Sequence, residues 1–124
     1  TTLAGANIVT TNAQNTFTKA QLPSTFTGTN LTLDFDTYQN FILTLSSGSN
    51  SLANPSTEAV GQSGIITLIQ DGTGSRTISL GTDYETAGGS GLTISTGANA
   101  VDIIPYFVKA SGSIQLGAPQ LAFA

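Results

Sequence analysis

The chain lacks cysteine, histidine, methionine and tryptophan, and it carries only three cationic residues among 124. Without cysteine it can form no disulfide and no thiolate metal site. Without histidine it cannot build the usual nucleophilic triads, and zinc sites of the His or Cys type are excluded as well. We therefore expect a protein that is not an enzyme, that needs no cofactor, and whose charge changes little between about pH 5 and 9.

Positive charge is especially scarce. The cations are Lys19, Arg76 and Lys109, against seven acidic residues, so the net charge is −4. No basic patch can form to neutralise a phosphate backbone, and we predict no binding to nucleic acid. No apolar run approaches the roughly 18 residues that cross a bilayer, and no charged-then-apolar leader opens the chain. We expect no attachment to a membrane.

What the chain does have is a moderate apolar content in a neutral polar background. Hydrophobic residues make up 39% of the sequence and charged residues 8%, and Thr, Ser, Asn, Gln and Gly fill the difference. Disordered chains combine low hydrophobicity with high net charge, which does not describe this sequence. A chain of this length suits one domain with one modest core.

Short windows of alternating apolar and polar residues indicate β-strands. In residues 31–36, Leu31, Leu33 and Phe35 would face a core while the residues between them face water, and residues 40–46 alternate in the same way. The two windows predict a hairpin through residues 37–39. The chain shows no apolar spacing of the helical kind over a comparable length.

The strongest local signal is the segment from residue 64 to residue 80. Two apolar runs, 64–70 and 76–80, flank Asp71-Gly72-Thr73-Gly74-Ser75, which is typical of a five-residue hairpin connection. Further strands are predicted at 91–95, 101–109 and 113–123. Short strands at this spacing predict an all-β domain over residues 21–124, an antiparallel β-sandwich or barrel of the jelly-roll type.

The first 20 residues differ from the rest because they are rich in Thr, Asn, Ala and Gln. We predict an extended N-terminal arm, either held by a neighbouring subunit or forming an edge strand of its own domain. Pro105 should place its strand at a sheet edge or a bulge, where an apolar surface needs a cover. The residues predicted to contact another subunit are Phe17, Lys19, Ile104, Tyr106, Val108, Leu121 and Phe123.

Few residues offer chemistry. Asp34 with Asp36 and Asp83 with Glu85 are the close carboxylate pairs, and each could in principle serve glycoside hydrolysis or bind calcium. Solvated strand faces and turns explain both pairs more simply, so we predict no catalytic residue and no metal site. Tyr84 and Arg76 are the candidate ligand contacts, Tyr84 as an aromatic platform, although core packing is an alternative for its ring.

The order of several motifs resembles a known module. The motifs are Leu52-Ala53-Asn54-Pro55, Gly61-Gln62-Ser63-Gly64-Ile65, Gln70-Asp71-Gly72-Thr73-Gly74-Ser75-Arg76 and Asn99-Ala100-Val101-Asp102, preceded by Phe17-Thr18-Lys19-Ala20-Gln21. Together they are similar to a module of virion structural proteins of tailed bacteriophages, found in tail fibres and other particle-surface proteins. The resemblance implies a virion role and carries over no catalytic residue. Related modules often have Trp where this chain has Tyr84.

The resemblance and the composition lead to one main functional hypothesis and two alternatives. The main hypothesis is a capsid decoration or cement protein on the virion surface that stabilises the particle by contacting the major capsid protein. The first alternative is a receptor-binding tail-fibre or spike domain that recognises host surface glycan, and the second is an extracellular filament subunit. In each case we predict a homo-oligomer, with a trimer as the favoured state.

Overall fold

A computed structural model describes residues 22–124, so the predicted arm, with Phe17 and Lys19, lies outside the described residues. The described part consists of strands, loops and one short turn of 3-10 helix, which confirms the all-β class. The structure therefore tests the strand predictions for the domain and leaves the arm a prediction. No helix in this part is long and apolar enough to cross a bilayer.

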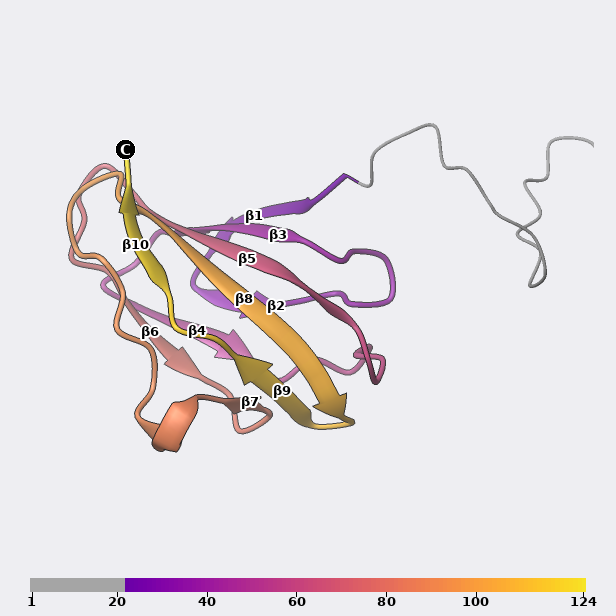
Figure 1. Ribbon diagram of the computed structural model, residues 1–124. Helices are drawn as coiled ribbons and strands as arrows, with labels where there is room; N and C mark the ends of the chain where they lie inside the picture. Colours follow the sequence, from indigo (N-terminus) through magenta and orange to yellow (C-terminus); the bar gives the residue numbers. More distant parts are fainter. Residues whose placement is uncertain (1–21) are drawn as a thin grey trace, which may run out of the picture.

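The strands form two sheets (Figure 1). Sheet A contains, in spatial order, β1 (Ser24–Gly28), β3 (Phe41–Leu45), β5 (Ser63–Gln70), β8 (Val101–Ala110), β9 (Ser113–Leu116) and β7 (Tyr84–Glu85), with β10 (Gln120–Phe123) also paired to β8. Sheet B contains β2 (Asn30–Thr32), β4 (Ser49–Ala53) and β6 (Thr77–Leu80). The helical turn η1 (Ala87–Gly89) follows β7.

The first six strands alternate between the sheets, which differs from the expected antiparallel hairpins. β1, β3 and β5 lie in sheet A and pair in parallel, and β2, β4 and β6 pair in parallel in sheet B. Each winding of the chain thus contributes one strand to each layer, as in a solenoid. Apolar alternation reports which face of a strand is buried and is the same in parallel and antiparallel sheets, so it could not reveal this winding.

The first predicted hairpin, between residues 31–36 and 40–46, is therefore wrong. Only the start of the first window is a strand, and Asp34 Oδ1 accepts the backbone N–H groups of Asp36 and Thr37, which bends the chain into a turn. Leu33 and Phe35 are nevertheless buried, as the alternation predicted. The pattern identified the core side chains correctly and the chain direction incorrectly.

The second predicted hairpin is wrong for a related reason, since β5 and β6 lie in different sheets. The connection packs against residues 96–99, where the Ser75 N–H donates to the Thr96 carbonyl and the Asn99 N–H to the Asp71 carbonyl. The buried amide of Gln70 donates to the carbonyls of Arg76 and Ser95 and fixes the corner. The Asp-Gly sequence makes the expected tight turn, and that turn carries the chain into the second layer.

The antiparallel part of the fold is built around β8, which pairs with β5 on one side and with β9 and β10 on the other. Pro105 was expected at a sheet edge or at a bulge, and the edge alternative is wrong because β8 is central. Its carbonyl accepts the Gly117 N–H in the connection between β9 and β10. The ring nitrogen faces the same side, where the ladder is already interrupted, so the missing donor costs no strand pairing.

Two further strand predictions need correction. Residues 91–95 form no strand, although Leu92 and Ile94 pack against the core. Residues 113–123 form β9 and β10 with a break at 117–119. The core lies between the two sheets and includes an aromatic cluster in which the Phe35 ring centroid lies 5.1 Å from that of Phe41 and 5.2 Å from that of Tyr106.

Candidate functional surfaces

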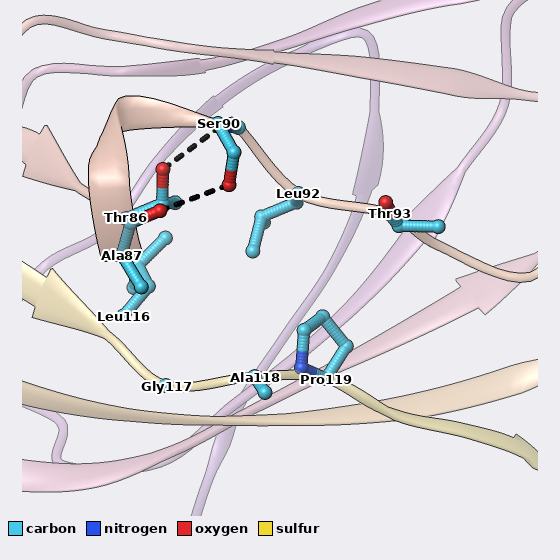
Figure 2. Close-up of a pocket in the computed structure, with 10 residues that line it drawn as sticks. Thr86, Ala87, Ser90, Leu92, Thr93, Leu116, Gly117, Ala118 and Pro119 are labelled. Carbon is cyan, nitrogen blue, oxygen red and sulfur yellow. Dashed lines mark hydrogen bonds between the residues drawn. The ribbon is translucent and has the colours of Figure 1, made fainter.

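A hollow of about 260 Å³ lies between η1 and the connection from β9 to β10. Figure 2 shows the side chains of Leu92 and Pro119 facing each other across it. Ala87 and Leu116 complete an apolar lining, because sheet A ends here and the loops above it contribute small side chains. The hollow is therefore shaped to receive an apolar group.

Two of the three hydroxyl side chains at this hollow are engaged within the loop. The Thr86 hydroxyl accepts the Gly91 N–H at 2.9 Å, and the Ser90 hydroxyl donates to the Ala87 carbonyl at 3.0 Å. Thr93 is the third hydroxyl side chain of the lining. A small-molecule site fixes its ligand with a few free polar groups on an apolar wall. The hollow therefore offers few polar side chains to a sugar.

Tyr84 does not form the exposed platform that was considered for it. Its side chain is only 6% exposed and belongs to the core, with its edge bordering a second, more open depression. Burial raises the pKa of the Tyr84 phenol, and the negative charges of Asp83 and Glu58 raise it further. Among the described residues Tyr84 Oη has no hydrogen-bond partner. The ring packs as a core residue, which was the simpler of the two explanations.

Arg76 lies in the turn after β5 and is bound by Asp71. Its Nε donates to Asp71 Oδ1 at 2.9 Å and its Nη2 to Oδ2 at 2.7 Å, so the two side chains form an ion pair across this turn. The Asp71 carboxylate also accepts the N–H groups of Thr73 and Gly74. The Arg76 hydrogen bond, with these backbone bonds, lowers the pKa of Asp71 to about 2. The Arg76 guanidinium therefore stabilises the turn, and its contacts with Asp71 leave it less available to a ligand.

The four carboxylates considered for catalysis or calcium are dispersed. Asp34 holds its own turn, and its hydrogen bonds, chiefly with Thr37, lower its pKa. Glu85 accepts the Ser113 hydroxyl and pairs with Lys109 at 3.1 Å, and both contacts lower the pKa of Glu85. Within residues 22–124 no cluster of three or more acidic, His or Cys side chains could hold a metal. These residues are explained by local structure.

The residues predicted at a subunit interface fall into two groups. Ile104, Tyr106 and Val108 point from β8 into the core and are at most 4% exposed, so they cannot contact another subunit in this fold. Leu121 and Phe123 on β10 are 49% and 46% exposed. The subunit interface therefore remains a prediction. On β8 only the side chains of the outer face, which alternate with the buried ones, could contribute to it.

The exposed large apolar side chains that the sequence analysis did not single out are Ile65 and Phe107, together with Leu22, Phe26 and Val60. β8 is apolar on both faces. Asp102 lies on the same face as Ile104, although a charged residue usually indicates the face that meets solvent. Asp102 is 2% exposed, and its carboxylate accepts the Ser95 N–H at 2.6 Å and the Ala122 N–H at 2.9 Å. Because a carboxylate that accepts backbone N–H groups can be buried, the charged residue lies on the core face of β8 and not on the solvent face.

Comparison with known proteins gives one match. A family model described as "Putative phage tail fibre C-terminal domain" matches residues 9–113, which is most of the 124-residue chain. No curated protein and no solved structure matches the chain. The matched range contains every strand from β1 to β8, so the two-layer winding described above is the structure of this family's domain in this chain.

Proposed function

The chain belongs to the phage tail fibre C-terminal domain family, and from this we propose that it is a structural domain of a tail fibre displayed on the surface of the virion. Membership makes it a structural component of a tailed-phage particle. The match over residues 9–113 carries the proposal, because it names the fibre rather than the head. The family is structural, and we propose that the domain acts without catalysis, through its surfaces.

The family favours the fibre over the capsid decoration that was our main hypothesis. A decoration protein binds the major capsid protein at equivalent positions over the whole head, so its copy number follows that of the capsid subunit. A fibre domain is present only at the few attachment points of the fibres. Position in the particle and stoichiometry therefore separate the two functions.

Quantitative mass spectrometry of purified particles tests the proposal. The fibre function predicts many fewer copies of this chain than of the major capsid protein, and the copies should leave with the tail when heads and tails are separated. Fractionated tails and heads from the same preparation serve as controls for each other. A copy number close to that of the capsid protein, or recovery with the head fraction, would contradict the fibre function and support capsid decoration.

Self-association belongs to the same proposal. A fibre domain that acts through its surfaces and carries uncovered apolar strands suits a homo-oligomer, and we propose a trimer. Ile65, Phe107 and Phe123 are each more than 40% exposed, which supports a cover from outside the chain. Sedimentation of the purified full chain measures the state, and a monomer at every concentration would contradict it.

Recognition of host surface glycan is a second candidate function, supported by the outer face of sheet B. This face presents small hydroxyl and amide side chains, namely Asn30, Thr32, Ser49, Ser51, Thr77 and Ser79. The hydroxyls of Ser51, Thr77 and Ser79 donate within the domain, to Asn30 Oδ1 and to the carbonyls of Gly48 and Asn50. Their oxygens can still accept from sugar hydroxyls, and the Asn30 amide can donate to them. Binding of the fluorescent full chain to host cells should be lost in excess purified surface polysaccharide. Binding that persists under competition, or no binding at all, would exclude glycan recognition.

A further inference from the structure

Strand β1 forms one edge of sheet A, and within residues 22–124 it pairs only with β3 (Figure 1). The Ser24 N–H donates to the Asn40 carbonyl, on the β3 side. Because successive N–H groups of a strand point to opposite edges, those of Thr25 and Thr27 point away from β3. The outer edge of β1 therefore presents a row of backbone donors and acceptors, which is a template for a further strand.

β1 has none of the features by which proteins protect the edge of a sheet. Edge strands are usually very short, charged, interrupted by proline or bent by a bulge. The residues of β1, Ser24–Gly28, are uncharged, include no proline and pair with β3 in an unbroken register. At the other end of sheet A, β7 has only two residues, and β10 has a register shift next to Ala122, whose φ is 56°. The difference indicates that the outer edge of β1 is covered.

The core is also open along this edge. Phe26 lies opposite Leu43, which lies opposite Leu68, so the three side chains share the face of sheet A that meets the core. Leu43 and Leu68 are 1% and 3% exposed, whereas Phe26 is 46% exposed. At the other end of the winding β8 pairs with β5 and closes the core. A solenoid needs a cap at each end, and residues 22–124 supply it at one.

We propose that residues 9–21 of this chain form the missing cap, by pairing as a strand with the outer edge of β1 and covering Phe26. These residues lie outside the described part of the chain. The inference selects one of the two alternatives predicted for the N-terminal arm, an edge strand of its own domain. It is independent of the proposed tail-fibre function.

The family match includes residues 9–21 in the domain, because it begins at residue 9 while the described residues begin at Leu22. When extended, residues 9–21 reach about 40 Å and β1 spans about 17 Å, so the chain is long enough to reverse direction and pair with β1. Residues 9–21 lead directly into β1, and a tethered segment has a far higher effective concentration than a segment of another molecule. The chain's own residues are therefore favoured over those of a second copy.

The composition of residues 9–21 suits a strand. The segment contains neither proline nor glycine, and Lys19 is its one charged residue. Side chains that are branched at Cβ favour extended backbone. The segment is rich in such residues, namely Val9, Thr10, Thr11, Thr16 and Thr18. A strand-forming segment thus precedes β1 in the chain.

Amide hydrogen exchange in the full wild-type chain, followed by NMR, tests the pairing without any substitution. Amides exchange slowly where they are hydrogen-bonded in a stable element. After correction for intrinsic rates, we expect the Thr25 and Thr27 amides to exchange at least about tenfold more slowly than that of Ser56, an exposed loop residue. Exchange as fast as that of Ser56 would show that the edge is open and would overturn the proposal.

Proline substitutions in the full chain identify the segment that protects β1. Neighbouring residues of a strand present their N–H groups to opposite edges, so one of Thr16→Pro and Phe17→Pro removes a donor that faces β1. At least one of them should speed the exchange of the Thr25 and Thr27 amides about tenfold. Ala4→Pro, outside the family match, is the matched control and should leave the exchange unchanged. Slow exchange in both variants would show that another segment covers β1.

Thiol reactivity separates a cover by the same chain from a cover by a second copy. Because the chain has no cysteine, Phe26→Cys and Val60→Cys each introduce a single thiol. The two positions are 46% and 69% exposed, so their exposure differs less than twofold. The Phe26→Cys thiol should react with a maleimide about tenfold more slowly than the Val60→Cys thiol at every protein concentration. Equal rates, or a difference that disappears on dilution because a second copy dissociates, would overturn the proposal.

Discussion

Asp102 shows how one residue can misdirect the interpretation of a strand and still be essential to it. Its carboxylate is buried and accepts one backbone N–H from the loop before β8 and one from β10. Both of its carboxylate oxygens accept a hydrogen bond, so the residue ties one loop and strand β10 to the central strand without any cation. A buried acceptor of this kind stabilises the fold only while both donors remain satisfied.

Asp102→Asn should therefore destabilise the domain. The amide offers one acceptor and one donor, so its NH₂ group would face a backbone N–H and leave a buried donor unpaired. We expect a loss of about 1–3 kcal/mol in the free energy of unfolding, measured by urea denaturation. Asp36→Asn, at an exposed position, is the control and should change little. Equal stability of the two variants would show that the Asp102 contacts contribute nothing.

Asp71 makes the acid stability of the domain predictable. Its pKa is lowered from 3.8 to about 2, chiefly by the hydrogen bond from Arg76. Because the unfolded chain binds a proton at the higher pKa, the stabilisation is complete above about pH 4 and is lost as the pH falls through about 2. The melting temperature of wild type should fall more steeply over this interval than that of Asp71→Asn. Parallel curves for the two proteins would contradict the shift.

At the scale of elements, the loop between β2 and β3 packs closely on β5. A Cβ atom at position 64 would overlap the backbone carbonyl oxygen of Gln39, and the same loop is held by the Tyr106 hydroxyl, which donates to that carbonyl. The glycine is thus required by space rather than by backbone conformation. This contact holds the return segment from sheet B against sheet A.

Gly64→Ala should disturb this packing and destabilise the domain by about 1–3 kcal/mol, since backbone atoms can yield only by moving the loop or the strand. Gly72→Ala is a matched control, because a Cβ there meets nothing within 4 Å and its φ is not positive. Thermal and urea unfolding of both variants provide the comparison. A Gly64→Ala variant as stable as Gly72→Ala would mean that the loop does not pack on β5 as described.

The sequence predicted the elements better than their arrangement. Apolar alternation identified Leu31, Leu33 and Phe35 as core side chains, and β8 was anticipated almost to its ends. The winding could not be predicted, because the turn at 71–75 is as suitable for a corner between two sheets as for a hairpin. What decides between them is the contact of this turn with residues 96–99, which are distant in sequence.

The candidate surfaces were predicted only in part, and for a similar reason. Leu121 and Phe123, predicted to contact another subunit, are exposed and so available for such a contact, whereas Ile104, Tyr106 and Val108 lie on the buried face of β8. A strand that is apolar on both faces does not reveal which face meets the core. That choice depends on the register with β5, which sets Ile66 opposite Ile104 and Ile65 opposite Pro105.

The charge and the stability of the whole molecule should change little around neutral pH. The sequence contains no histidine and no cysteine, so few groups titrate between about pH 5 and 9. Burial raises the pKa of Tyr106 to about 12. Because this pKa is raised, the neutral phenol contributes stability below the ordinary tyrosine pKa of 10, and that stability is lost as the pH rises through about 12.

The melting temperature should accordingly stay nearly level from about pH 5 to 9 and fall above about pH 10. Tyr106→Phe should show a smaller fall above this pH, after allowance for its lost hydrogen bond to Gln39. Calorimetry over the full pH range measures both effects. A transition near neutral pH in the wild-type chain would contradict this description of its ionisable groups.

The whole molecule offers surfaces rather than a cluster of reactive groups, which suits a structural component of the particle. The function then depends on where in the particle the domain is attached. The family match supports the proposed tail-fibre function, and the location of the chain on the virion is the decisive observation.

Electron microscopy of intact particles labelled with gold-conjugated antibody against this chain measures that location directly. A tail-fibre domain predicts gold confined to the fibres at the tail, with bare heads in the same images. Gold distributed over the head, with none on the fibres, would contradict the proposed function.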